Sequence, residues 1–96
     1  TESRKKQRRF LFMKNIKFII MSQVVTHNGA LIRINPQKRN RIEISKDGGR
    51  IWRLRYEGMM YGEFIDLNDA GTEIIATTTK GVYASKNEGM VWLKRS

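Results

Sequence analysis

Two stretches of this chain repeat each other at a distance of forty residues, and this repeat constrains the fold more than any other feature. The stretches are residues 45–52 and 85–92. The matched positions are Ser45, Asp47, Gly49 and Trp52 in the first stretch and Ser85, Asn87, Gly89 and Trp92 in the second. A fixed period of about forty residues is typical of repeat proteins, in which each small sheet needs a neighbour to bury its face.

Short alternating segments lead into the first stretch. A strand is expected at residues 16–25, although a short helix over residues 10–20 is an alternative because apolar side chains also share one helical face there. His27-Asn28-Gly29 is a tight-turn sequence. Further strands are expected at residues 30–35, 41–44 and 50–56, with the polar connection 35–40, which holds Pro36, and a turn at 46–49 between them.

The second half repeats this order. Strands are expected at residues 61–67, 73–78, 82–85 and 90–94, with turns at 68–71, 80–81 and 87–89. Alignment of Asn28-Gly29 with Ala70-Gly71 gives an offset of 42, so two residues are lost before the third strand. The sequence therefore predicts an all-β domain of two four-stranded antiparallel meander units, residues 16–57 and 58–96, after a basic N-terminal extension of residues 1–15.

The two stretches resemble the Asp-box, also called the bacterial neuraminidase repeat, with the pattern Ser-x-Asp-x-Gly-x-Thr-Trp. The segment 75–92 resembles the blade of such proteins as well, and the resemblance covers about residues 28–96. It implies β-propeller blades, with the box on the hairpin between the third and fourth strands. This chain departs from the pattern at Ile51 and Val91, which replace Thr, and at Asn87, which replaces Asp.

The residue types in the box suit a structural role. The Asp47 carboxylate can accept hydrogen bonds from backbone N–H groups of its own turn, and Gly49 can adopt a left-handed conformation. Trp52 offers a large apolar surface to an adjacent sheet, and its indole N–H needs a partner. We expect the box to stabilise a hairpin and to pack blades together, without chemistry of its own.

The sequence predicts no catalytic, cofactor or metal site. The proteins that this chain resembles include sialidases, which are expected to use an arginine triad, a tyrosine with a glutamate, and an aspartate acid, spread over a full propeller. No local pattern joins such residues here. Cysteine is absent, which removes disulfides and thiol chemistry, and His27 is the only histidine, expected in a turn. Asp66 and Asp69 flank a turn, and a calcium site is the alternative interpretation there.

The positive charge is concentrated in the first part of the chain. Residues 1–57 hold fifteen basic and four acidic residues, and residues 58–96 hold four and five. Strand alternation predicts that Arg53 and Arg55 project from one face and Trp52, Leu54 and Tyr56 from the other. The candidate polyanion-binding residues are Arg4, Lys5, Lys6, Arg8, Arg9, Arg33, Arg41, Arg53 and Arg55. Charges that keep outer strands soluble are the alternative interpretation.

No apolar run approaches the roughly eighteen residues of a membrane span, because Lys14, Asn15 and Lys17 interrupt the segment from Phe10 to Met21. The composition does not choose a cellular compartment.

Two blades leave open edges, whereas propellers have about four to eight blades. The chain is therefore expected to be a piece of a longer propeller or to form homo-oligomers, in which three copies would make six blades; closure into a small sandwich or barrel is a third possibility. The predicted function is a non-catalytic binding or scaffold module for a glycan or protein partner. Tyr56 and Tyr83 are the aromatic residues expected to contact a sugar. A small basic protein that associates with nucleic acid is the alternative.

Overall fold

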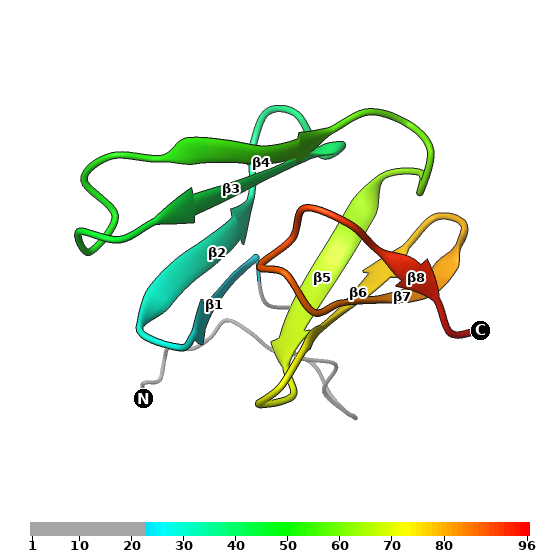
Figure 1. The fold of residues 1–96 in the computed structure, drawn as a ribbon. Coiled ribbons are helices and arrows are strands. Elements are labelled where there is room, and N and C mark those ends of the chain that lie inside the picture. Colours follow the sequence, from blue (N-terminus) through cyan, green and yellow to red (C-terminus); the bar gives the residue numbers. More distant parts are fainter. Residues whose placement is uncertain (1–22) are drawn as a thin grey trace, which may run out of the picture.

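The computed structural model describes residues 23–96, which form eight short strands in two sheets (Figure 1). The first sheet contains β1 (Val24–His27), β2 (Ala30–Ile34), β3 (Arg41–Ser45) and β4 (Arg53–Glu57). The second contains β5 (Phe64–Asp69), β6 (Ile74–Thr78), β7 (Gly81–Ser85) and β8 (Leu93–Lys94). Each sheet is an antiparallel meander with its strands in chain order, and residues 23–96 contain no helix. The prediction of an all-β fold with two four-stranded antiparallel units is confirmed.

The β1–β2 hairpin follows from its turn residues. Asn28 and Gly29 have φ angles of 51° and 82°, and His27 pairs with Ala30 across the turn. Positive φ at both central residues matches the right-handed twist of the flanking strands, and Asn and Gly are the residues that tolerate it best. The turn therefore fixes the register that places Ala30, Ile32 and Ile34 on the buried face.

The two units align with a slightly different offset than the sequence suggested. Ser45 pairs with Leu31 in the first sheet, and Ser85 pairs with Ile74 in the second. The first two strands are therefore offset by 43 residues rather than 42, and three residues rather than two are lost between the second and third strands. The predicted alignment was wrong by one residue because the loops in that region share little beyond their glycines.

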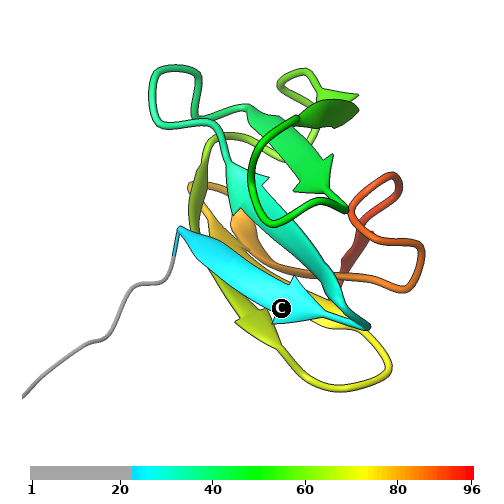
Figure 2. The same ribbon diagram turned by 90° about the vertical axis from the view of Figure 1, so that its left-hand side faces the viewer.

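One hydrophobic core lies between the two sheets. Figure 2 shows the sheets facing each other, with the β7–β8 connection beside β3. The core contains the inward isoleucines of the first sheet and the aromatic side chains of the second. Its buried members are Ala30, Ile32, Ile34, Ile42, Ile44, Tyr61, Phe64, Leu67, Ile74, Ala76, Tyr83 and Trp92. Each sheet thus buries one face against its neighbour, as a repeat architecture requires.

Closure into a barrel or a single eight-stranded sheet does not occur. The strand order is β1-β2-β3-β4 in one sheet and β5-β6-β7-β8 in the other, with no ladder between them. Side-chain bonds join the first strands instead: the Gln23 side chain donates to the carbonyl of Ile65 over 2.8 Å. The alternative of a closed small barrel was therefore wrong, and the described chain has free strand edges.

Some predicted strand boundaries were wrong. Strand β4 begins at Arg53 rather than residue 50, and β8 begins at Leu93 rather than residue 90. Strand β5 begins at Phe64, because residues 58–63 form the connection between the sheets. Within that connection Met59 and Met60 are 55% and 71% exposed, so they do not cover a contact between the units. Residues 16–22 and the extension of residues 1–15 lie outside the described residues.

Strand β4 contains a bulge at Arg55. Ile42 pairs with Tyr56, and the next residue, Glu43, pairs with Leu54. Arg55 is therefore an extra residue of β4 between these two pairs. A bulge of this kind leaves one residue unpaired and reverses the alternation of faces beyond it. The prediction that Trp52, Leu54 and Tyr56 share one face was therefore wrong: Leu54 is 53% exposed, while Tyr56 packs against the core.

Candidate binding surfaces

Residues 45–52, the first hairpin segment, are held by the side chains of Ser45 and Asp47. Asp47 Oδ1 accepts hydrogen bonds from the backbone N–H groups of Arg50 and Ile51, at 3.1 and 3.0 Å. Ser45 Oγ accepts from the N–H of Gly49 and donates to Asp47 Oδ1, both at 2.8 Å. Hydrogen bonds from the Ile51 N–H, the Ser45 hydroxyl and the Arg50 N–H hold the pKa of Asp47 below its ordinary value. Because Asp47 engages the N–H groups of residues 50 and 51, these residues do not join the ladder of β4, which begins at Arg53.

Residues 85–92, the second hairpin segment, repeat this arrangement. Asn87 Oδ1 accepts from the N–H of Val91 and from Ser85 Oγ, both at 2.9 Å. Ser85 Oγ also accepts from the N–H of Gly89 at 2.9 Å. Glu88 and Gly89 have φ angles of 64° and 92°, which correspond to 77° and 95° at positions 48 and 49 of the first segment. The two segments therefore share one local conformation.

The second hairpin segment is docked onto the first sheet. Arg55 Nε donates to the carbonyl of Glu88 over 3.1 Å, and Arg55 Nη2 donates to the carbonyl of Asn87 over 2.9 Å. A Cβ atom at Gly89 would lie 2.8 Å from Cγ2 of Ile42, so a larger residue cannot occupy this position without displacement. We call this contact of residues 87–89 with Ile42 and Arg55 the internal interface.

The two tryptophans have different surroundings. Trp92 is 2% exposed, lies 5.3 Å from the Phe64 ring, and donates its indole N–H to the carbonyl of Gly89 at 2.9 Å. Trp52 is only half-buried, and the guanidinium of Arg33 lies 4.2 Å above its ring. The equivalent side chain is thus a core residue in one unit and a surface residue in the other.

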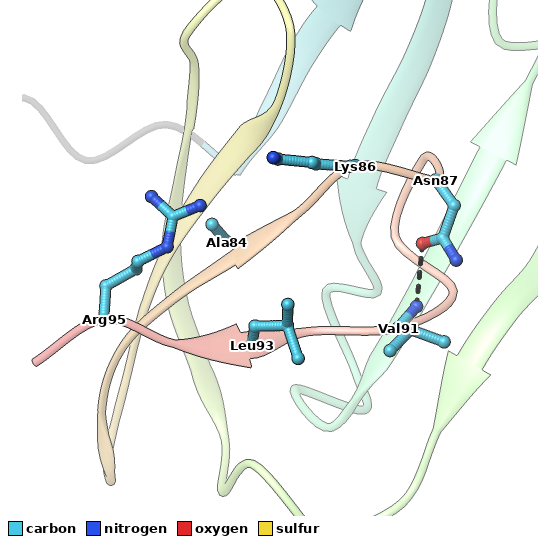
Figure 3. Close-up of a pocket in the computed structure, with 6 residues that line it drawn as sticks. All are labelled: Ala84, Lys86, Asn87, Val91, Leu93 and Arg95. Atoms are coloured by element: carbon cyan, nitrogen blue, oxygen red, sulfur yellow. Dashed lines mark hydrogen bonds between the residues drawn. The ribbon is translucent and has the colours of Figure 1, made fainter.

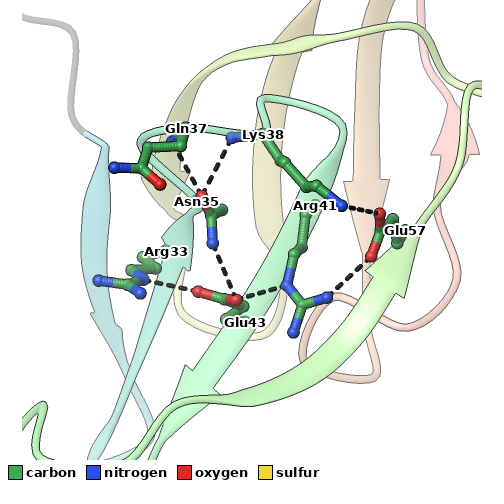
Figure 4. A network of polar contacts seen from close by, with 7 residues as sticks. All are labelled: Arg33, Asn35, Gln37, Lys38, Arg41, Glu43 and Glu57. Carbon is green, nitrogen blue, oxygen red and sulfur yellow. Dashed lines mark hydrogen bonds and ion pairs between the residues drawn. The ribbon is translucent and has the colours of Figure 1, made fainter.

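The outer face of the first sheet, which points away from the core, carries a network of ion pairs (Figure 4). Glu43 is 4% exposed and accepts from Arg33 at 2.7 Å, from Asn35 at 3.0 Å and from Arg41. Burial raises the pKa of Glu43, but the hydrogen bonds from Arg41, Arg33 and Asn35 outweigh it and leave this pKa below its ordinary value. Glu57 extends the network by pairing with Arg41 at 2.8 Å.

These contacts divide the predicted polyanion-binding residues. Arg33 and Arg41 are already paired with carboxylates, and Arg55 donates to backbone carbonyls of the internal interface. Arg53 is exposed, and it makes no side-chain hydrogen bond or ion pair with another residue of the range 23–96. The remaining candidates, Arg4, Lys5, Lys6, Arg8 and Arg9, lie outside the described residues. The structure does not gather the predicted arginines of the sheet into one cationic cluster.

The outer face of the second sheet carries an apolar row. Ile75, Ala84 and Leu93 are paired directly across β6, β7 and β8. A groove of about 200 Å³ lies over this row (Figure 3), and Leu93 and Val91 are 62% and 51% exposed beside it. The groove is lined by Ala84, Lys86, Asn87, Val91, Leu93 and Arg95. It exists because Ala84 occupies the position that Ile44 occupies in the first sheet, which removes three carbon atoms from the sheet surface.

Arg95 stands at one end of this groove. Its guanidinium pairs with the carboxylate of Glu73 through two contacts, at 2.7 and 3.1 Å. Lys86 lines the groove as well. The sequence interpretation missed this surface, although the position of Arg95, forty residues after Arg55, was a signal that could have indicated it.

His27 was expected in a turn, and it lies directly before the Asn28-Gly29 turn. It is the last residue of β1, it is 2% exposed, and its Nδ1 lies 2.6 Å from Asp69 Oδ1 at the end of β5. This contact, with the N–H of Gly71, holds the pKa of Asp69 below its ordinary value. The pair joins the first strands of the two sheets, so its role is an interface contact.

The aromatic residues expected to contact a sugar are not free platforms. Tyr83 is 7% exposed and stacks edge-on against Tyr61, with ring centroids 5.2 Å apart. Tyr56 is half-buried, and its hydroxyl accepts from the N–H of Met60. The expectation that Tyr83 is exposed was wrong because it lies on the inner face of its sheet. Within residues 23–96, no three His, Cys, Asp or Glu side chains lie close enough to hold a metal ion.

Comparison of the chain with models of protein families, with curated proteins and with solved structures gave no match. In the described part of the chain, no helix has the length and apolar character needed to cross a membrane.

Proposed function

We propose that the chain is a non-catalytic scaffold module of the Asp-box propeller type, which binds a protein partner through the outer face of its second sheet. The observation that carries this proposal is the groove over Ala84, flanked by the exposed side chains of Val91 and Leu93. An exposed apolar patch with a polar rim is typical of a protein interaction surface. Lys86 and Arg95 supply that rim.

The geometry favours a protein over a glycan. Sugar-binding sites commonly present an aromatic face, and Tyr83 and Trp92 are buried here. Trp52, the remaining half-buried tryptophan, is covered by the Arg33 guanidinium. The groove is lined by aliphatic side chains, with Lys86, Asn87 and Arg95 around them and no aromatic ring, which suits a protein side chain or loop better than a sugar ring.

Association with nucleic acid is the second candidate. The formal net charge of +10 and the exposed Arg53 favour it. Against it, Arg33 and Arg41 are engaged by Glu43 and Glu57, so these two charges are largely compensated. We therefore expect a general attraction to polyanions without selectivity.

Binding of duplex DNA, heparin and a glycan array, each measured across a range of salt concentrations, tests this proposal. We expect affinity for DNA and for heparin to fall steeply and in parallel with salt, as counterion release requires, and we expect no turnover of a sialoside. Selective glycan or DNA binding that persists in high salt would overturn the protein-scaffold function. Turnover of a sialoside would overturn the non-catalytic assignment.

A further inference from the structure

The internal interface has two halves. The receiving half is on the first sheet, where Ile42 meets Gly89 and Arg55 donates to two carbonyls. The inserted half is the tip of the second hairpin segment, residues 87–89. Because the two units repeat, each half has an equivalent position elsewhere in the chain.

The receiving half is repeated on the outer face of the second sheet. Arg95 and Val82 follow Arg55 and Ile42 by forty residues. The backbone N–H groups of Arg95 and Ser96 both donate to the carbonyl of Val82, at 2.7 and 3.3 Å. Two successive donors on one carbonyl indicate a bulge, and it lies where Arg55 forms the bulge of β4. Arg95 therefore leaves its strand at the same irregularity as Arg55.

The inserted half is repeated in the first hairpin segment. Its tip, residues 47–49, has the hydrogen bonds and φ angles of the second tip. A Cβ built on Gly49, the equivalent of Gly89, would contact only Trp52 and Leu31 of its own unit, at 3.6 and 3.7 Å, whereas a Cβ on Gly89 meets Ile42 of the other sheet. A Cβ built on Gly48 has no such contact within 4 Å. Within residues 23–96, the first tip is thus not docked onto another sheet.

We propose that a second copy of this chain joins these two free halves, head to tail. Arg95 of one copy donates to the carbonyls of Asp47 and Gly48 of the next copy, as Arg55 does to those of Asn87 and Glu88 within the chain. This inference rests on the proposed scaffold function and identifies its partner. The partner's first hairpin segment then lies beside the groove over Ala84 and covers the exposed apolar row.

Charge favours this direction of assembly. Residues 23–57 hold eight basic and three acidic residues, whereas residues 58–96 hold four and five. Head-to-tail contact places a cationic unit against a nearly neutral one, while contact between two first sheets would oppose like charges. A head-to-tail interface that closes on itself forms a ring, and propellers have about four to eight blades. We therefore expect two to four copies of two blades each.

The mass of the full chain in solution, measured by light scattering over a range of concentrations, tests the assembly. We expect a discrete species of two, three or four times 11.3 kDa. A mass of 11.3 kDa at every concentration reached would overturn the inference. A monomer would not by itself overturn the proposed function, which is overturned by selective DNA or glycan binding that persists in high salt.

Substitutions at Arg95 and Glu73 separate a contact between copies from an effect on the sheet itself. Arg95→Ala should weaken association about tenfold or more, because it removes charge-assisted hydrogen bonds. Glu73→Gln breaks the same internal ion pair but leaves Arg95 free to act, so association should be unchanged or tighter. If Glu73→Gln weakens association as much as Arg95→Ala does, the arginine acts within its own sheet and the inference is wrong.

A gain of affinity is the sharpest test. Gly48→Glu copies Glu88, whose carboxylate lies 3.5 Å from Arg55 in the internal interface. Glu88 adopts a φ of 64°, so glutamate can occupy this conformation. Association should tighten about two- to fivefold relative to Gly48→Gln, which has the same shape without the charge. The gain should vanish when Arg95→Ala is added; a gain that persists would contradict the assigned contact.

Complementation tests the direction. Leu93→Glu should disable the receiving half, and Asp47→Pro, which removes a backbone N–H and restricts the turn, should disable the inserted half. Each variant alone should be monomeric, and their equimolar mixture should form a dimer through the one intact interface. A head-to-tail contact is excluded if Asp47→Pro leaves the mass of the assembly unchanged, or if the mixture stays monomeric. Circular dichroism shows whether each variant is folded. If Asp47→Pro is unfolded, Gly48→Arg takes its place in the experiment.

Discussion

The two hairpin segments have the same local structure and different surroundings. In each, a serine hydroxyl and a side-chain oxygen two residues later satisfy the N–H groups of the turn. Yet Trp92 is buried against Phe64, while Trp52 lies at the surface beneath Arg33. The difference shows that the motif determines a hairpin, and that the neighbouring sheet determines what the tryptophan contributes.

Residues at equivalent strand positions of the two sheets also have different surroundings. Glu43 and Tyr83 are equivalent, as are Arg33 and Ala76, according to strand pairing. In the second sheet this face is apolar and packs into the core. In the first sheet it carries the network of Glu43 with Arg33, Arg41 and Asn35. The same place in the repeat is therefore a core face in the second sheet and an ion-pair surface in the first.

The largest expected difference is between the two tryptophans. Trp92→Ala should lower the free energy of unfolding by about 3–5 kcal/mol, because it removes a large side chain from the core. Trp52→Ala should lower it by only about 1–2 kcal/mol, since a half-buried ring and one cation–π contact are lost. Urea denaturation followed by circular dichroism measures both.

Trp92→Phe and Trp52→Phe are the milder matched pair if Trp92→Ala does not fold. Their order should be the same, with smaller values. Equal losses at the two positions would show that the difference in burial has no energetic consequence.

The glycines of the two tips should also differ. Gly89→Ala places a Cβ 2.8 Å from Ile42, whereas the nearest contact of a Cβ at Gly49 is 3.6 Å. Both substitutions carry a strain of about 1–2 kcal/mol because φ is positive at both positions. Gly89→Ala should add about 1–3 kcal/mol of overpacking. Comparison of the two unfolding midpoints in urea checks this, and a smaller loss at Gly89 would contradict the close approach of the internal interface.

The hairpins and the repeat could be predicted from the sequence, because turn chemistry is local. Asn28-Gly29 specifies its turn by its φ angles, and the Ser-to-Trp stretches specify theirs by side-chain oxygens. The buried face of each sheet could not be predicted in this way. Glu43 and Tyr83 have the same place in the repeat, and only the position of the neighbouring sheet makes one an outer residue and the other a core residue.

The roles of residues on the candidate surfaces were even harder to predict from the sequence, because they depend on contacts between residues far apart in the chain. The bulge at Arg55 reverses the alternation that the sequence pattern assumed, and it turns a predicted phosphate-binding residue into a contact for carbonyls 32 and 33 residues away. Likewise, Arg33 meets Glu43 because of the strand register. The burial of His27 against Asp69 requires the packing of β1 beside β5. No local pattern reports these contacts.

The ion-pair network offers a smaller test. Glu43→Gln should lower the free energy of unfolding by about 1–3 kcal/mol, because it weakens hydrogen bonds with two arginines in a shielded position. Tyr83→Phe, at the equivalent place, should have an effect below about 1 kcal/mol, since its ring packing is retained. Urea denaturation at neutral pH measures both, and a neutral Glu43→Gln would show that the network adds nothing to stability.

The smallest expected effect concerns the acceptors of the two hairpins, Asp47 and Asn87. Hydrogen bonds from Ile51, Ser45 and Arg50 lower the pKa of Asp47 in the folded state. A carboxylate with a depressed pKa stabilises the fold above its unfolded pKa, and this contribution is lost as the pH falls through the folded value. Asp47→Asn should therefore reduce the loss of stability on acidification below about pH 4, and Asn87→Asp should increase it.

Urea denaturation of the wild type and both variants, from neutral pH to about pH 2.5, measures these slopes. Four other carboxyl groups also have pKa values below their ordinary values: Glu43, Glu57, Asp69 and Glu73. The contribution of each hairpin is therefore the difference in slope between its variant and the wild type. If Asn87→Asp adds as much acid dependence as Asp47→Asn removes, the two hairpins are interchangeable locally. The contrast between Trp52 and Trp92 then arises from the neighbouring sheets alone. Unequal changes would instead assign part of that contrast to the hairpins themselves, and would show that the internal interface alters the acceptor at position 87.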